Sequence, residues 1–159
     1  MKKLLAVVLM AVMSLTVFAG CSDPVFDDLE NFLNVQMTEV NADYEKITAE
    51  VSTWETIEDD VAIAKSIEEV LLPLVNGSLT KLEAINPATE EVKELKAKYI
   101  KVMDAYKAGF EALYEACETQ DEATINAGNE SLNEGVELLD EYNASLEALA
   151  KEHGAEIEY

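Results

Sequence analysis

Arginine is absent from this chain, histidine occurs once, and cysteine occurs only twice among the 159 residues. The eleven basic residues are all lysine and stand against 33 acidic residues, so the formal net charge is −22. Such a surface repels phosphate backbones, which excludes a nucleic-acid-binding protein. The lone histidine, His153, belongs to no HxxxH, CxxC or ExxH pattern, so the common transition-metal and acid–base sites are missing. We therefore expect no enzymatic activity and no cofactor.

Long apolar runs are scarce as well, and the longest lies at the start of the chain. Two lysines precede an apolar run over residues 4–18, and the small residues Ala19 and Gly20 follow it. At 15 residues the run is short for a stable membrane span, which needs about 20. The layout is typical of a signal peptide that is cleaved after small residues. Residues 1–20 are the predicted leader, and we expect no second membrane segment.

The leader ends at a cysteine. The motif Val-Phe-Ala-Gly-Cys over residues 17–21 resembles the bacterial lipobox, although Phe18 departs from the usual leucine. The resemblance implies that Cys21 becomes the first mature residue and carries two or three acyl chains, enough for stable anchoring. The alternative is an ordinary signal peptide that happens to end before a cysteine. We expect a protein anchored by lipid to the cell membrane on its extracytoplasmic face.

Little chain separates this cysteine from the first helical pattern. Residues 21–24 form the lipidated cysteine and a very short tether, and residues 25–159 form one domain. Nine lysines and 33 acids remain after the leader is removed, a net charge of −24. We expect this acidic domain to stand upright, close to the bilayer. Cys117 is then the only thiol in the domain, which favours a small buried hydrophobic residue over a nucleophile.

The domain has helical periodicity throughout. Apolar residues recur at steps of three and four in four segments, which span residues 26–54, 57–85, 92–117 and 125–149. No segment alternates with the period of two that a strand requires. Short turns between long helices predict an all-α fold, an antiparallel up-down-up-down four-helix bundle that follows a cleaved N-terminal signal helix. A self-associating coiled coil is the rival arrangement.

Helix boundaries follow from local chemistry. Thr56 with Asp59 resembles a capping box, and Asn86-Pro87 is typical of an N-cap followed by proline at the first helical position. Asp121 is expected to cap the last helix, and Gly154 to end it. Pro73 predicts a kink or break within the second segment, near residues 72–78.

Three glycines lie in the last two segments, at positions 109, 128 and 135. Close approach of two helices is the first interpretation of such glycines. The second is a small apolar ligand cavity in the bundle. The residues predicted to line that cavity are Tyr106, Phe110, Gly128, Gly135, Leu139 and Tyr142.

Acidic clusters are the only cation-binding candidates. Glu58, Asp59 and Asp60 are weak candidates for a metal site, because negative charge at a helix start is already explained by the helix dipole. Five of the lysines fall within residues 93–107, where we expect them to complement acids on the adjacent helix. Trp54 is expected to be partly exposed at one end of the bundle, and His153 to interact with the carbonyl end of the last helix.

The second half of the chain carries a further resemblance. It rests on Asn-Pro, Glu-Leu-Lys-Ala-Lys-Tyr, Leu-Tyr-Glu-Ala-Cys-Glu-Thr-Gln-Asp-Glu and Leu-Ala-Lys-Glu-His-Gly, within residues 85–154. The segment is similar to helical hairpins in uncharacterised lipoproteins of Gram-positive bacteria, which implies location and fold but no activity. The expected function is a non-enzymatic binding or scaffold module with an envelope protein as partner, present as a monomer or weak homo-oligomer. The alternative is a helical bundle that binds a small ligand or divalent cation, as a sensor or buffer.

Overall fold

The structure is a computed structural model that describes residues 14–16, 23–57 and 59–158. Within these residues the chain is helical apart from two strands of three residues each, so the expected helical class is confirmed. Most of the predicted leader and Cys21 lie outside the described residues. No helix in the described part of the chain combines the length and apolar character that a membrane span needs.

The first helical rod has four consecutive pieces. They are α1 (Pro24–Asn31), a π-helical turn η1 (Phe32–Gln36), α2 (Thr38–Thr53) and a 3₁₀ turn η2 (Trp54–Thr56). The predicted apolar stripe is buried from Leu29 to Val51. The π turn adds one residue to the helical repeat, so Phe32 and Leu33 both point into the core. Strict heptad spacing did not identify Phe32 as a core residue.

The second rod consists of α3 (Asp60–Ser66), a π turn η3 (Ile67–Leu71) and α4 (Leu72–Ala84). The predicted interruption lies just before residues 72–78, because the α-helix is broken by the π turn η3 and α4 then continues past Pro73 to Ala84. In the π turn the backbone N–H of Leu72 reaches back to the carbonyl of Ile67. The widened turn directly before Pro73 accommodates the residue that has no N–H to donate.

Two long helices complete the chain, α5 (Glu90–Thr119) and α6 (Glu122–Glu152). Asp121 caps α6 by accepting from the N–H of Thr124 at 3.0 Å, as predicted. Gly154 adopts a φ of +77° just beyond the helix, which confirms the predicted stop. The Asn86-Pro87 start is wrong, since α5 begins at Glu90.

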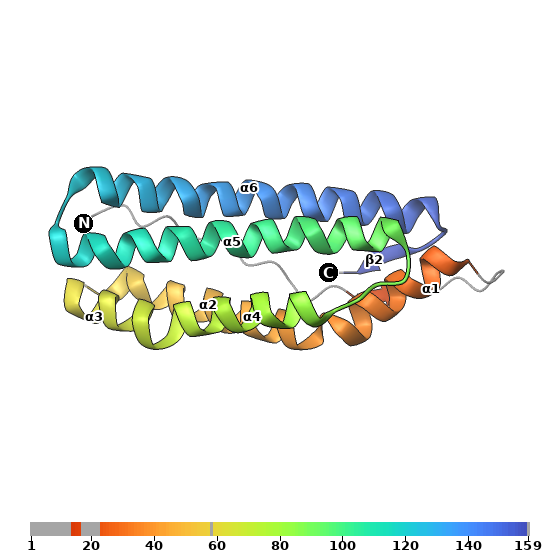
Figure 1. The fold of residues 1–159 in the computed structure, drawn as a ribbon, viewed down its shortest axis with the longest axis horizontal. Helices are drawn as coiled ribbons and strands as arrows, with labels where there is room; N and C mark the ends of the chain where they lie inside the picture. Colours follow the sequence, from red (N-terminus) through yellow and green to blue (C-terminus); the bar gives the residue numbers. More distant parts are fainter. Residues whose placement is uncertain (1–13, 17–22, 58, 159) are drawn as a thin grey trace.

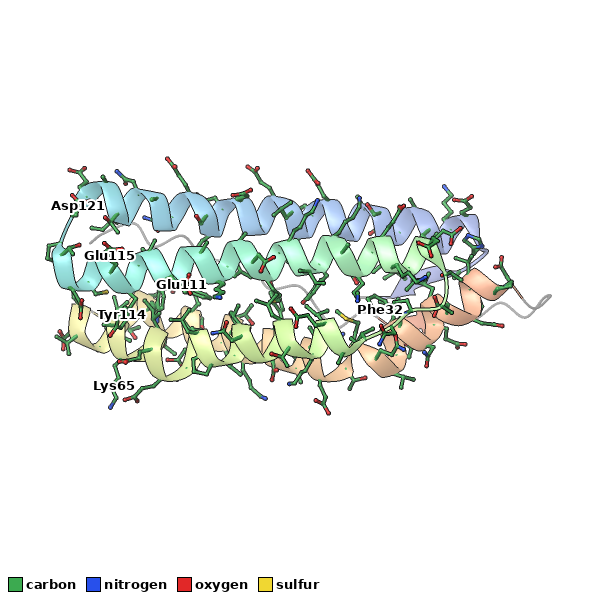
Figure 2. All side chains as sticks on the ribbon, viewed as in Figure 1. Phe32, Lys65, Glu111, Tyr114, Glu115 and Asp121 are labelled. Carbon is green, nitrogen blue, oxygen red and sulfur yellow. The ribbon has the colours of Figure 1, made fainter. Side chains whose placement is uncertain are left out.

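Figure 1 shows the long helices side by side, with α5 and α6 antiparallel along their full length. The rod that contains α4 packs against both α2 and α5. We call one end of the molecule the α1 end; it contains residues 23–31, 85–91 and 149–155. We call the opposite end the α3 end; it contains residues 54–57, 59–61 and 117–122. In Figure 2, Phe32 lies toward the α1 end, whereas Lys65, Tyr114 and Asp121 lie toward the α3 end.

The two strands are β1 (Ser14–Thr16) and β2 (Glu156–Glu158), which pair antiparallel. No strand was expected, and the pairing spans only three residues of each segment. β1 lies within the predicted leader, so cleavage of that leader would remove the partner of β2.

Trp54 is buried, so the expectation that it would be partly exposed is wrong. Its side chain is 3% exposed, and the indole N–H donates to Ser66 Oγ at 2.9 Å. Ser66 in turn donates to Glu50 Oε1 at 2.7 Å, and the Phe110 ring packs edge-on against the indole. This polar chain joins α2 to α3 and lets a tryptophan near a helix end lie fully in the core.

The expected capping box at the start of α3 is also wrong. The Thr56 hydroxyl donates to the carbonyl of Thr53 and makes no capping contact with α3. Asp59 alone caps α3, by accepting from the N–H of Val61 at 3.0 Å.

Candidate functional site

Acidic side chains at the α1 end hold three segments of the chain together. Asp23 caps α1 by accepting from the N–H groups of Val25 and Phe26. Its other oxygen lies 2.6 Å from His153 Nδ1, just past the end of α6. The contact with His153, together with the two backbone N–H groups, lowers the pKa of Asp23 although desolvation opposes this. The first residues of α1 are therefore tied to the last turn of α6.

Asp28 makes the second connection at this end, and it explains where α5 begins. Its buried carboxylate accepts from the N–H groups of Ala88 and Thr89 at 3.0 and 2.8 Å, and from the Thr89 hydroxyl at 2.7 Å. An acid on α1 thus holds the two residues that directly precede α5, including its N-cap residue Thr89. Burial opposes ionisation of Asp28, but these hydrogen bonds prevail and lower its pKa.

A third acid joins α2 to α4. Asp43 is buried and accepts from Lys81 Nζ, and from Lys46 Nζ at 3.2 Å. Burial again opposes ionisation, while the two lysines prevail and lower the pKa of Asp43. The sequence places Asp43 beside the apolar stripe of residues 40–47, but periodicity alone does not identify its lysine partner.

The glycines of α5 and α6 mark a close crossing. A Cβ added to Gly109 would lie 2.6 Å from Leu132 Cδ2, and one added to Gly128 would lie 2.8 Å from Leu113 Cγ. At Gly135 the added atom would meet the Tyr106 ring at 2.6 Å. Side chains of the facing helix already occupy the space beside each glycine. This agrees with the interpretation that the glycines allow α5 and α6 to approach closely.

The predicted cavity residues fall into two groups. Tyr106 and Phe110 extend from α5 with ring centroids 6.5 Å apart, and Tyr106 covers Gly135. Tyr142 contacts Tyr99 edge-to-face at 5.0 Å. Leu139 is buried in the same core. A ligand volume among the predicted residues stays a prediction.

Tyr44 of α2 joins this group, and the sequence did not single it out as a site residue. Its ring stacks on Tyr106 with centroids 6.2 Å apart. The two side chains are 6% and 2% exposed, and their hydroxyls lie near each other. Neither hydroxyl has a hydrogen-bond partner outside the pair among the described residues. A buried hydroxyl without a partner costs about 1–3 kcal/mol. We call Tyr44 and Tyr106 the tyrosine pair. Gln36 Oε1 and the fully buried Ser78 hydroxyl likewise lack a partner among the described residues.

Both phenols of the pair stay protonated. Burial raises the pKa of Tyr106 far above its usual value, and the adjacent Tyr44 and the negative charge of Asp140 raise it further. Burial likewise raises the pKa of Tyr44, although the hydrogen bond with Tyr106 opposes this shift in part. The pair therefore presents two neutral hydroxyls.

The weak metal candidates have structural roles. Asp59 is the N-cap of α3, and Asp60 accepts from Gln120 Nε2 at 2.9 Å. Glu58 lies outside the described residues. In the described chain no three Asp, Glu, His or Cys side chains converge as metal ligands would.

The lysines of α5 make short-range contacts. Lys93 and Lys107 pair with Glu90 and Glu111 of the same helix. Lys96 donates to the carbonyl of Ile85, and Lys98 donates to Ser145 Oγ of α6 at 2.7 Å. These contacts involve four of the five lysines of α5.

Cys117 is half-buried and free. Burial and the negative charge of Asp60 raise the pKa of its thiol, which disfavours the reactive thiolate. The packing of Cys117 against the core agrees with the expected small hydrophobic role.

Comparison of the chain with protein-family models, with curated proteins and with solved structures gives no match. The site is therefore interpreted from its own geometry.

Proposed function

We propose that this chain is an extracytoplasmic lipoprotein, held at the membrane by lipid on Cys21, and that its domain is a non-enzymatic binding or scaffold module. The observation that carries the proposal is the leader that ends at Cys21, with α1 beginning three residues later at Pro24. We further propose that the four rods form an antiparallel up-down-up-down four-helix bundle, as short turns between long helices favour.

The contacts at the α1 end support a role that depends on rigid attachment. Asp23 is two residues from the proposed lipid and is bonded to His153, while Asp28 holds Thr89, the residue before α5. A lipid on Cys21 would thus join a segment that is itself fixed to both long helices. Since α5 has 30 residues, the α3 end would project about 45 Å from the lipid-proximal end.

The chemistry of the described side chains supports a module without catalysis. His153 is engaged by Asp23, and the thiol of Cys117 is kept protonated by burial and by Asp60. The acids at the α3 end serve as caps and turn contacts. A partner would meet a polar, negatively charged helical surface, most freely at the α3 end.

Lipid attachment is tested by growing cells with labelled palmitate and comparing wild type with Cys21→Ser and Cys117→Ser. The chain has no other cysteine, so Cys117→Ser is a matched control. We expect label in wild type and Cys117→Ser and none in Cys21→Ser. Label that persists in Cys21→Ser, or none in wild type, would reject the anchor.

Partner binding is tested by a photo-crosslinking residue placed in intact cells, either at Asp121 of the α3 end or at Glu152 of the α1 end. We expect one recurrent protein adduct from Asp121 that disappears in Cys21→Ser. Adducts only with abundant nonspecific neighbours, equal at both positions, would count against the scaffold.

A second function, small-ligand binding, is favoured by one observation. The hydroxyls of the tyrosine pair are buried without hydrogen-bond partners outside the pair among the described residues. Such groups are costly to keep unless something binds them.

A further inference from the structure

The end of α6 determines the path of the C-terminal strand β2, which turns back from that end (Figure 1). Gly154 has a φ of +77° and its N–H donates to the carbonyl of Lys151, while the N–H of Ala155 donates to the carbonyl of Ala150 at 2.8 Å. This is the Schellman type of helix end. Ala155 is buried, and the half-buried Ile157 packs against the core. These contacts hold β2 in place without help from the leader.

The leader strand β1 lies between two parts of the domain. It pairs antiparallel with β2 and lies against η1 of the first rod, while β2 packs against α6. Within the described residues, these two strands make up the whole sheet. Cleavage of the leader would therefore leave β2 with an edge whose backbone N–H and C=O groups have lost their strand partner.

An open strand edge that is already in position is a binding surface for an extended peptide. Backbone hydrogen bonds to the edge supply the affinity, and the residues that alternate along the strand supply the specificity. The edge lies near the proposed lipid, because β2 begins three residues after His153, which is bonded to Asp23. A peptide bound there would lie close to the membrane.

The register of the pairing indicates the chemistry of the occupant. It aligns Leu15 with Ile157, and it aligns a serine and a threonine of β1 with the two glutamates of β2. A second copy of β2 in the same antiparallel register would oppose glutamate with glutamate, and like charges in opposed positions destabilise a strand pair. The fitting segment has an apolar residue opposite Ile157, flanked by uncharged or basic residues.

We propose that β2 is a docking edge for an extended peptide segment of this pattern. In the precursor the leader strand β1 occupies the edge, and after removal of the leader a segment of another protein pairs with it. The inference rests on removal of the proposed leader. It adds to the scaffold function a second surface, separate from the α3 end.

The pairing in the precursor is tested in the full chain with Cys21→Ser and Cys117→Ser, which leaves no native thiol. Leu15→Cys with Ile157→Cys places two thiols at directly opposed strand positions, the arrangement from which a disulfide forms. Leu15→Cys with Glu152→Cys, in the last turn of α6, is the control. After mild oxidation in a nonionic detergent, we expect the disulfide in the first pair and not in the control, read by mobility on a non-reducing gel.

The open edge is tested on the mature chain, produced directly from residue 21 with Cys21→Ser. The probe is a fluorescein-labelled peptide of residues 12–18 with two lysines added at each end for solubility, and fluorescence anisotropy measures its binding. We expect saturable binding to the mature chain. Binding to the full chain with Cys21→Ser, in the same detergent, should be about tenfold weaker or less, because its own β1 competes intramolecularly.

Peptides of identical charge distinguish strand pairing from general attraction to an acidic chain. One is methylated on the backbone nitrogen of Leu15, and the other on those of Ser14 and Thr16. Alternate residues of an antiparallel strand bond to the same neighbour, so one methylated peptide should lose about tenfold in affinity and the other should lose less. A third peptide, with glutamate in place of both Ser14 and Thr16, should also bind more weakly.

A truncation locates the edge. Removal of residues 156–159 should abolish peptide binding, whereas removal of residue 159 alone should not, and circular dichroism shows whether each chain is folded. Absence of the disulfide, absence of saturable peptide binding, equal binding of the methylated peptides, or unchanged binding to a folded chain without residues 156–159 would overturn the docking edge. Palmitate labelling and crosslinking from Asp121 do not involve β2, so those tests would be unaffected.

Discussion

The two halves of the domain are held together by different means. The α5–α6 half has two uninterrupted helices of 30 and 31 residues, and its glycines let them approach closely. The α1–α4 half has two π turns and a 3₁₀ turn, and buried polar contacts fix its segments. Those contacts are made by Asp43 with Lys81 and by Trp54 with Ser66, and Asp28 adds a contact from α1 to the residues before α5.

The helices of the two halves are therefore fixed differently, by steric fit in one half and by directional hydrogen bonds in the other. In the α5–α6 half, the register follows from which side chains fit over each glycine. In the α1–α4 half, helix interruptions loosen the heptad pattern, and hydrogen bonds to acids specify which segments meet. The largest expected effect therefore comes from substituting an acid of the α1–α4 half.

Asp28→Ala should be the most damaging single change. It leaves the N–H groups of Ala88 and Thr89 and the Thr89 hydroxyl without their acceptor, and the segment that leads into α5 loses its connection to α1. We expect a loss of about 3 kcal/mol of unfolding free energy, measured by urea denaturation. Asp27→Ala, one residue earlier and exposed, is the control and should change little. Equal stability of the two variants would show that α1 does not hold the segment that leads into α5.

Gly109→Ala tests the close packing of α5 against α6. The new methyl group would meet Leu132 at 2.6 Å and the Gly128 carbonyl at 3.1 Å, so α5 and α6 must separate. We expect a loss of about 2 kcal/mol despite the better helix propensity of alanine. Gly77→Ala in α4, where an added Cβ has no neighbour within 4 Å, should instead gain about 0.5–1 kcal/mol. The same sign for both substitutions would contradict the close-crossing account.

Sequence reasoning succeeded where local chemistry determines structure. The helical class, the inward stripe from Leu29 to Val51, the Asp121 cap and the Gly154 stop all follow from residues near one another in the chain. It failed at Asn86-Pro87, where Asp28, 60 residues away, binds the N–H groups of Ala88 and Thr89 ahead of α5. At Pro73 it predicted an interruption but not its form, because heptad spacing gives no sign of the π turn that precedes the proline.

The candidate site was predictable only in part. Tyr106 and Gly135 were singled out by residue type and spacing, and the structure brings them into contact. Tyr44 was placed on the core face, but its lack of a hydrogen-bond partner outside the tyrosine pair among the described residues depends on how α2 meets α5. A one-dimensional pattern reports which side of a helix is buried, whereas hydrogen-bond satisfaction depends on neighbours from other helices.

Acid should weaken the α1–α4 half through Asp28 and Asp43. Hydrogen bonds and lysines outweigh burial and hold both pKa values below 3.8 in the folded state. A lowered folded pKa gives stability that is present above 3.8 and is lost as the pH falls through the folded value. Asp28→Asn should therefore be less stable than wild type at pH 7, and the gap should close well below pH 3.8. Urea titrations across this range measure the gap, and a gap that widens in acid would reverse the assignment.

His153→Ala should have the smallest effect, and the effect should be local. The Asp23–His153 contact is partly exposed, with side-chain exposures of 38% and 18%, so solvent screens it. Asp23 would still cap α1 through Val25 and Phe26, so we expect a slight fall in melting temperature and faster hydrogen exchange confined to the first turn of α1. Lys151→Ala, in the last turn of α6, is the control. A fall as large as that of Asp28→Ala would mean that the charged contact, and not the buried Asp28 contact, secures the α1 end, and the contrast between the two halves would need to be redrawn.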